Sequence, residues 1–210
     1  MQGYIFDLDG TLFDSMGVWE QIDKDFLKKR GIGVPGDYIQ AISALTLPEA
    51  ASYTIARFNL AETVPQLLHE WHTMAVDAYS HTVALKPYGK AFLLKLKQGG
   101  KKLAIATSAP PGLYLPALKN HDILHLFDAI CDADEVGAGK TSPDIFLLAA
   151  QKLGLPPCEC TVFEDILPGI QSAKSIGMTV YGVYDHSNQK DWEAIQKTAH
   201  GTVWDFKAFI

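Results

Sequence analysis

Asp7 and Asp9 are two carboxylates separated by one residue, directly after the apolar segment of residues 3–6. Alternate residues of an extended chain point to the same side, so both carboxylates lean together while Leu8 packs away from them. Gly10 then permits a turn and a close approach of a ligand to the backbone. Two unneutralised carboxylates repel each other, and a hard cation such as Mg²⁺, which prefers a few carboxylates and water, relieves that repulsion. The pair therefore predicts a magnesium site in preference to an acidic surface turn.

A hydroxyl pair follows the next predicted strand. The apolar run of residues 103–106 ends at Thr107 and Ser108, and Pro110 and Pro111 then open a predicted helix. Backbone N–H groups and the helix N-terminus point at the same place, which suits the oxygens of an anion. Thr and Ser are also common helix N-caps, so these residues alone leave both interpretations open.

Lys140 stands in a glycine-rich loop before another predicted helix. Ser142 is the expected N-cap of that helix, and Pro143 is its expected first residue. A Lys in this place can neutralise phosphate oxygens, although a solvated loop Lys has the same local sequence. The Gly-x₄-Gly-Lys spacing of a Walker loop is absent.

Two further acids, Glu164 and Asp165, follow the apolar run of residues 161–163. Asp165 can complete a set of metal ligands, and Glu164 can orient Lys140 or a metal-bound water. The alternative is an acidic cap of the next helix. The acid pair, hydroxyls, lysine and second acid pair all lie at strand ends, and parallel sheets bind ligands at the carboxyl ends of their strands.

The elements that position these residues follow a repeating pattern. Short apolar runs alternate with helical patterns from about residue 85 onward, which predicts an α/β, Rossmann-like, doubly wound parallel sheet with helices on both faces. The predicted strands are residues 3–6, 103–106, 127–131, 161–163, 178–183 and 202–204. The predicted helices between them include residues 90–97, 143–153 and 169–176.

The region between the first strand and this alternating part has only helical patterns, over residues 18–29, 47–58 and 65–79. We therefore expect an α/β catalytic core made of residues 1–15 and 85–210, interrupted by an inserted α-helical cap domain at 16–84.

Composition limits the possible partners. The chain has 210 residues and a formal net charge of −6, which argues against a nucleic acid polymer because phosphate backbones are held by Lys and Arg. Three cysteines cannot form a paired disulfide framework, which favours a reducing compartment. No signal peptide is evident, and no run of about 18 apolar residues could span a membrane. We expect a cytoplasmic protein without a membrane partner, as a monomer or weak dimer.

The whole chain resembles the haloacid dehalogenase-like hydrolases, in the subgroup with a helical cap inserted after the first motif. Residues 7–15, DLDGTLFDS, are close to the most recognisable signature of that family. Thr107, Lys140 and residues 164–165 fall where the second, third and fourth motifs belong. The third motif departs at Thr141, where Pro is commonest, and this change affects the rigidity of the loop and not its charge.

The resemblance implies a Mg²⁺-dependent phosphohydrolase that acts on a small phosphorylated metabolite. Asp7 would be the nucleophile that forms an aspartyl-phosphate, and Asp9 would protonate the leaving oxygen and then activate water. Thr107, Ser108 and Lys140 would hold the phosphoryl oxygens. Family members that cleave carbon–halogen bonds lack the second acid, so Asp9 favours phosphoryl transfer.

The resemblance also implies the metal ligands, which would be Asp7, Asp165 and Asp9, the last through its backbone carbonyl. Thr11 and Glu164 would support this site. It leaves the substrate open among a sugar phosphate, a nucleotide and another monoester.

Two alternatives stay open. The nearest branch is β-phosphoglucomutase-like. Its mutases have a cap His where this chain has Trp19. They also have a cap Arg in a stretch that matches residues 43–47, and this chain has no Arg in that stretch. We therefore favour a phosphatase, with the mutase as the alternative. Ser15 and Trp19 are candidate specificity residues, and Trp19 could equally belong to the cap core. A receiver-type phosphoacceptor module is the remote alternative, because one domain of about 120 residues does not explain this chain.

Overall fold

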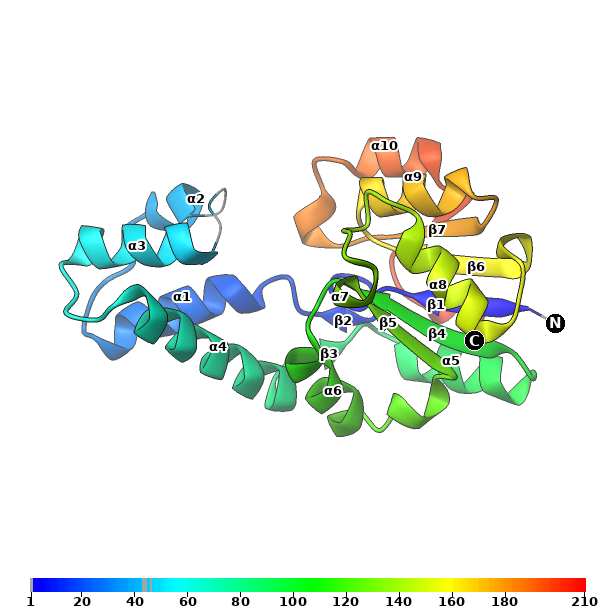
Figure 1. Ribbon diagram of the computed structural model, residues 1–210, viewed down its shortest axis with the longest axis horizontal. Coiled ribbons are helices and arrows are strands. Elements are labelled where there is room, and N and C mark those ends of the chain that lie inside the picture. The colour runs from blue at the N-terminus through cyan, green and yellow to red at the C-terminus, as the bar shows by residue number, and fades with distance from the viewer. Residues whose placement is uncertain (1, 43–44, 46) are drawn as a thin grey trace. The chain divides into compact units, whose positions relative to one another are not determined.

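The chain forms two compact units in the computed structural model, which describes residues 2–42, 45 and 47–210 (Figure 1). The first unit combines Met1–Met16 with Val83–Ile210, and the second is Gly17–Thr82. The insertion predicted from the sequence is 16–84. Among the residues described, none of the helices has the length and apolar character needed to span a lipid bilayer.

A six-stranded parallel sheet forms the centre of the first unit, in the order β5-β4-β1-β6-β7-β8. Its strands are β1 (Gly3–Phe6), β4 (Lys102–Thr107), β5 (Ala129–Asp132), β6 (Cys160–Glu164), β7 (Thr179–Val183) and β8 (Gly201–Val203). The central strand is β1, where Ile5 pairs with Ala104 of β4 and with Val162 of β6. Parallel pairing brings all the carboxyl ends to one edge. The predicted Rossmann-like α/β sheet is confirmed.

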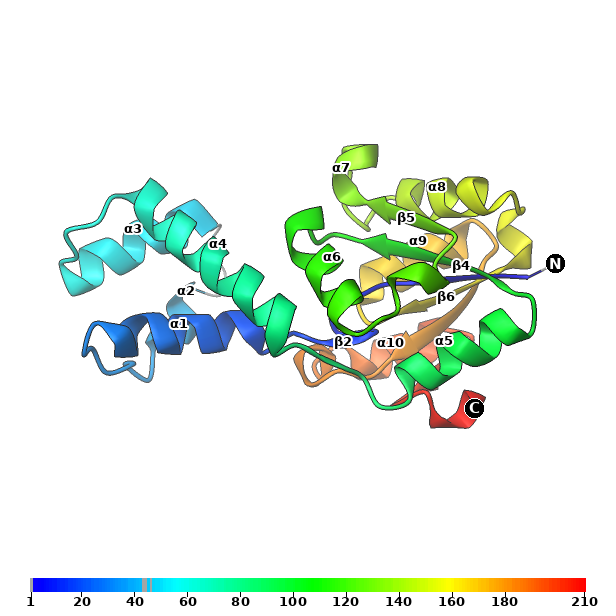
Figure 2. The same cartoon turned by 90° about the horizontal axis from the view of Figure 1, so that it is seen from below.

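Helices cover both faces of this sheet (Figures 1 and 2). They are α5 (Gly89–Gln98), α6 (Pro111–Asn120), α7 (Ala133–Val136), α8 (Asp144–Leu153), α9 (Leu167–Ser175) and α10 (Trp192–Thr198). Successive strand residues face opposite sides. Ile5 and Val162 join the core that contains residues of α8 and α9. Their neighbours Phe6 and Phe163 pack against Phe92 of α5, with ring centroids 5.9 and 5.5 Å apart.

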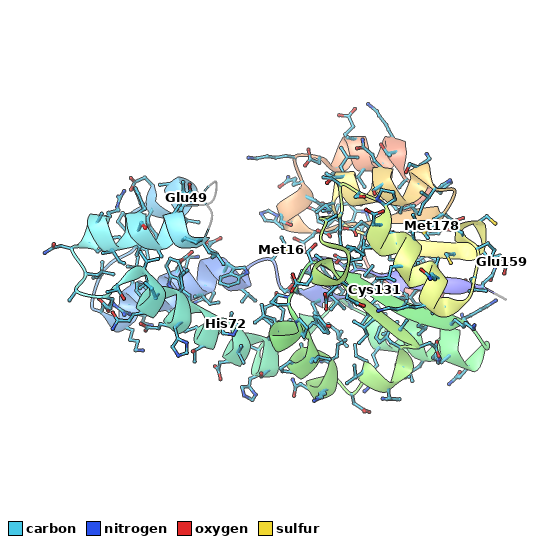
Figure 3. The ribbon with its side chains drawn as sticks, in the orientation of Figure 1. Met16, Glu49, His72, Cys131, Glu159 and Met178 are labelled. Atoms are coloured by element: carbon cyan, nitrogen blue, oxygen red, sulfur yellow. The ribbon has the colours of Figure 1, made fainter. Side chains whose placement is uncertain are left out.

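The three cysteines are free thiols. Cys131 on β5 and Cys160 on β6 are buried, and Cys158 is exposed. Cys131 belongs to the same apolar core as Met178, which precedes β7 (Figure 3). Burial raises the pKa of both Cys131 and Cys160 to about 11, so these two thiols are structural apolar groups and not nucleophiles.

Two short strands lie where the chain leaves the first unit and returns to it. Strands β2 (Phe13–Asp14) and β3 (Ala84–Leu85) pair antiparallel, with Phe13 opposite Leu85. These strands could not be predicted from the sequence, because two residues cannot show a strand periodicity. Only the pairing of distant segments makes them strands.

The second unit contains the helices α1 (Val18–Lys29), α2 (Tyr38–Ile42), α3 (Leu47–Phe58) and α4 (Val64–His81). No strand occurs among its described residues. Trp71 of α4 packs edge-on against Phe26 of α1, with ring centroids 5.8 Å apart. Arg30, just after α1, donates hydrogen bonds of 2.6 Å to Glu62 and to Glu70. These contacts hold α1 and α4 together.

Candidate active site

The first motif leaves β1 in a tight turn at the carboxyl edge of the sheet. The Asp7 N–H donates to the Phe163 carbonyl at 3.0 Å and so continues the β1–β6 pairing by one residue. The chain then turns back, and the Phe13 N–H donates to the Leu8 carbonyl at 2.7 Å. Gly10 in this turn has a φ of 80°, a backbone conformation that favours glycine. The turn keeps the Asp7 carboxylate buried at the end of the central strand.

Three acids gather at this edge. Asp7, Glu164 and Asp165 are buried, and one carboxylate oxygen from each lies within 4.8 Å of the others. Lys140 forms ion pairs with Asp7 and with Glu164, and its Nζ donates to Glu164 Oε2 at 2.9 Å. One ammonium group cannot balance three carboxylates, so the cluster needs a further positive charge when all of them are ionised.

Asp165 provides the most specific sign of a cation-binding site. Its Oδ1 accepts a hydrogen bond from Thr11 Oγ1 at 3.4 Å. Its Oδ2 is buried and has no hydrogen-bond partner in the described part of the chain. An unsatisfied buried polar atom costs about 1–3 kcal/mol, and more when it is charged. A carboxylate oxygen without a donor, beside two other carboxylates, fits a hard divalent cation such as Mg²⁺.

The pKa shifts have the same origin. Burial raises the pKa of Asp7 to about 6, with Lys140 acting in the opposite direction. Burial also raises the pKa of Asp165, and the negative charge of Asp7 adds to this effect. Burial by itself would lower the pKa of Lys140, but the charges of Asp7 and Glu164 hold it above its ordinary value. A bound cation would favour the ionised form of both aspartates.

Asp9 has a different environment from this cluster. Its carboxylate accepts a hydrogen bond from the buried Ser15 hydroxyl at 2.6 Å. The three-acid cluster contains Asp7 and Asp165 of the predicted metal ligands, together with Glu164, and does not contain the Asp9 carboxylate. Asp9 is thus a half-buried acid oriented by a neighbouring hydroxyl.

The two predicted hydroxyl residues differ in burial. Thr107 is buried at the end of β4, and its Oγ1 accepts a hydrogen bond from the Ala109 N–H at 3.0 Å. Ser108 is exposed. Pro110, and neither hydroxyl residue, is the N-cap of α6, so the helix-cap interpretation of Thr107 and Ser108 is wrong.

Lys140 is buried in the loop before α8, so its interpretation as a solvated loop residue is also wrong. The expected capping of α8 needs a correction. The helix begins at Asp144, with Pro143 as its N-cap. Ser142 makes no cap and instead donates its hydroxyl to Asp144 Oδ2 at 2.6 Å. The short loop still presents the Lys140 ammonium to the acids at the ends of β1 and β6.

The residues predicted to set specificity belong to different units. Ser15 lies in the first unit and Trp19 in the second. Trp19 is 36% exposed on α1 and lines a cavity with Trp71 and Leu47. Its role in specificity stays a prediction. Of the stretch 43–47 compared with the mutases, residues 43, 44 and 46 lie outside the described part of the chain.

One residue near the site was missed by the sequence analysis. Asn188 is 4% exposed, and its Nδ2 donates to the carbonyls of Asp165 and Val183, each at 2.9 Å. The Asp185-x-x-Asn188 spacing could have suggested a capped turn. No signal along the chain connects that turn with Asp165.

Comparison with known proteins agrees with this geometry. A family model described as haloacid dehalogenase-like hydrolase matches residues 1–177, which include all four motifs at the sheet edge. The chain belongs to the haloacid dehalogenase-like hydrolases. The resemblance noted in the sequence is therefore confirmed for most of the chain.

Relatives in this family extend over nearly the whole chain. Fructose-1-phosphate phosphatase YqaB of Escherichia coli is 32% identical over 183 residues, which are 86% of this chain and 95% of that protein. The phosphorylated carbohydrates phosphatase of Thermotoga maritima is 28% identical over 189 residues, covering 90% and 88% of the two chains. Among solved structures, a putative beta-phosphoglucomutase from Thermotoga maritima has a TM-score of 0.86 at 27% identity, covering 97% and 94%. The expectation of a phosphatase enzyme of this family is confirmed.

Proposed function

We propose that this protein hydrolyses the phosphate monoester of a small sugar or related polyol, with Asp7 as nucleophile and Mg²⁺ as cofactor. The observation that supports it is the buried cluster of Asp7, Glu164 and Asp165 facing Lys140, with one Asp165 oxygen unpartnered. The relatives named for fructose 1-phosphate and for phosphorylated carbohydrates suggest the substrate class.

The chemistry follows from the positions of the acids. The Asp7 carboxylate attacks phosphorus, the bond from phosphorus to the sugar oxygen breaks, and an acyl phosphate forms on Asp7. Asp9 donates a proton to the departing sugar oxygen. It then accepts a proton from the water that cleaves the acyl phosphate and releases inorganic phosphate. The Ser15 hydroxyl orients Asp9 for both transfers.

Charge on the phosphoryl oxygens is stabilised by the other motif residues. Lys140 stays protonated because Asp7 and Glu164 hold its pKa above its ordinary value. Glu164 keeps the ammonium at the sheet edge through its 2.9 Å hydrogen bond. Thr107 and Ser108 stand at the end of β4, where they would donate to the same oxygens.

Asp7, Asp165 and the Asp9 backbone carbonyl would hold Mg²⁺. When bound, the ion supplies positive charge that offsets the carboxylates and the phosphoryl group. The unpartnered Asp165 Oδ2 and the raised pKa values of Asp7 and Asp165 fit this ligand set.

The proposal is tested by measuring phosphate release from p-nitrophenyl phosphate and from a panel of sugar, polyol and nucleoside monophosphates, with Mg²⁺ and with EDTA. We expect release with Mg²⁺, fastest among the sugar and polyol phosphates, and a near-complete loss with EDTA. Equal rates in both conditions would overturn the metal assignment. A preference for nucleotides would overturn the substrate class and leave the chemistry intact.

A sugar phosphomutase is the second candidate, favoured by the structural likeness to the putative beta-phosphoglucomutase at 27% identity. The two activities give different products from a hexose 1-phosphate supplied with a small amount of the hexose 1,6-bisphosphate. A mutase converts the substrate to the hexose 6-phosphate with no net phosphate release. We expect stoichiometric inorganic phosphate and no 6-phosphate.

A further inference from the structure

The β6–β7 pairing ends just short of Asp165. Glu164 pairs with Gly182, and beyond this point the carbonyls of Asp165 and Val183 both need a donor. Two carbonyl oxygens cannot bond to each other. The Asn188 Nδ2 carries two hydrogens and donates one to each carbonyl, at 2.9 Å in both cases. Asn188 is buried, so its amide satisfies both carbonyls at a place that water does not reach.

The orientation of this amide is determined by its own partners. The Asn188 Oδ1 accepts a hydrogen bond from the Asp185 N–H at 3.3 Å, which directs the nitrogen toward the two carbonyls. Asp185 in turn accepts from the Ser187 N–H at 2.9 Å and from the Ser187 hydroxyl at 2.8 Å. The turn after β7 is therefore internally bonded, and Asn188 projects from it in one direction.

A buried ion pair connects this turn to the first motif. The Lys86 Nζ donates to Asp185 Oδ2 at 2.5 Å, and both side chains are buried. The Lys86 backbone N–H donates to the Leu12 carbonyl at 2.8 Å. Leu12 lies in the turn that begins at Asp7. Buried ion pairs contribute more to defined geometry than to net stability, because desolvation offsets their attraction.

The Asp165 carboxylate has sparse hydrogen bonding of its own. Its Oδ1 accepts a 3.4 Å hydrogen bond from Thr11 Oγ1, and its Oδ2 is unpartnered in the described part of the chain. The direction of the carboxylate therefore depends on the Asp165 backbone, and Asn188 holds that backbone. We propose that Asn188 is a positioning residue for the metal-binding carboxylate of Asp165, and that the Lys86–Asp185 ion pair keeps Asn188 in place. This inference rests on the proposed function, because the metal role of Asp165 does.

The test is the Mg²⁺ affinity of the full chain, measured by titration calorimetry without substrate. Partners behind metal ligands change affinity by about 10–100-fold when removed. We expect Asn188→Ala to bind Mg²⁺ at least tenfold more weakly, and excess Mg²⁺ to restore part of its kcat with little change in the KM for p-nitrophenyl phosphate. Asn120→Ala, which removes an exposed Asn at the end of α6, is the matched control and should retain wild-type affinity.

Ile195→Val is the control for a loss of stability without a change at the site. It shortens a buried side chain of α10 and should lower the melting temperature without changing Mg²⁺ affinity. If Asn188→Ala does not fold, Asn188→Ser keeps one donor and is measured in its place, with the same expected weakening. The double variant Lys86→Met with Asp185→Asn removes both charges and should weaken Mg²⁺ binding at least threefold.

The possible results separate the two proposals. Asn188 variants that bind Mg²⁺ within twofold of wild type would overturn the positioning role while the phosphatase stands. Wild-type affinity in the Lys86 and Asp185 double variant would overturn the part assigned to the ion pair. A wild-type protein that binds no Mg²⁺ and releases no phosphate would overturn the proposed function first.

Discussion

A Cβ atom at Gly10 would lie 2.4 Å from Asp165 Oδ2, the buried carboxylate oxygen that has no hydrogen-bond partner in the described part of the chain. The first and fourth motifs therefore meet at Gly10, which is 155 positions from Asp165 along the chain. Gly10 is required twice over, because its φ of 80° also disfavours any side chain.

Gly10→Ala should abolish Mg²⁺ binding at this site or weaken it by roughly 10–100-fold, since Asp165 must move away from the new methyl group. The positive φ adds a stability cost of about 1 kcal/mol. Gly31→Ala is the matched control, because Gly31 has a φ of 69° with open space around its Cβ position. Gly31→Ala should lose about this much stability in urea denaturation and keep its activity, whereas Gly10→Ala should lose at least as much stability and also its activity. Wild-type turnover in Gly10→Ala would contradict the placement of Asp165 in the site.

Asp7→Asn should lower turnover of p-nitrophenyl phosphate by about three decades or more, which corresponds to about 4 kcal/mol in the barrier. An amide is a poor nucleophile and a weaker metal ligand. Circular dichroism should show an intact fold, because the substitution is isosteric. Asp14→Asn, at an exposed position of the same motif, should retain full activity. A smaller loss for Asp7→Asn would argue against covalent catalysis by this residue.

Magnesium binding should release protons near pH 6. The pKa of Asp7 is raised to about 6 in the protein without metal, so Asp7 carries a proton in about half of the molecules at pH 6. Mg²⁺ requires the ionised form, so its affinity should rise as the pH rises through 6. Calorimetry in two buffers of different ionisation enthalpy measures the protons released. Binding at pH 6 without proton release would contradict the raised pKa.

The same shift predicts the stability of the metal-free protein. The folded state binds a proton on Asp7 that the unfolded chain has already lost between pH 4 and 6, so stability falls as pH rises through this window. The difference in melting temperature between the wild type and Asp7→Asn, both in EDTA, should show this decrease, and saturating Mg²⁺ should reduce it.

Two tryptophans of the second unit should separate packing from specificity. Trp71 is 3% exposed and packs against Phe26, so Trp71→Ala should lower the free energy of unfolding by about 3–5 kcal/mol. Trp19 is 36% exposed, and Trp19→Ala should cost roughly 1 kcal/mol or less. We expect Trp19→Ala to change the ranking of sugar phosphates more than the rate with p-nitrophenyl phosphate. A large stability loss with an unchanged ranking would place Trp19 in the core of the helical unit.

Much of the fold was predictable from local pattern. The central strand at residues 3–6 and the helices at residues 18–29 and 47–58 match the bounds of β1, α1 and α3. Apolar runs and helical spacing depend on neighbours a few residues apart, and these can be seen along a sequence. The failures have two different causes. Strands β2 and β3 are too short for a pattern, and the cap predicted at Ser142 gave way to Pro143, whose fixed φ suits the start of α8.

The sequence by itself determined the residue types at the strand ends and, through the alternation of apolar runs with helices, a parallel sheet that brings those ends to one edge. Only the tertiary structure decided which atoms meet there. Thr11 reaches Asp165 across 154 positions, Lys86 reaches Asp185 across 99, and Asn188 holds the Asp165 carbonyl. Such contacts depend on the register of the strands and on the packing of the loops between them. Secondary-structure propensity depends on residues a few positions apart, so it does not indicate which distant residues folding brings together.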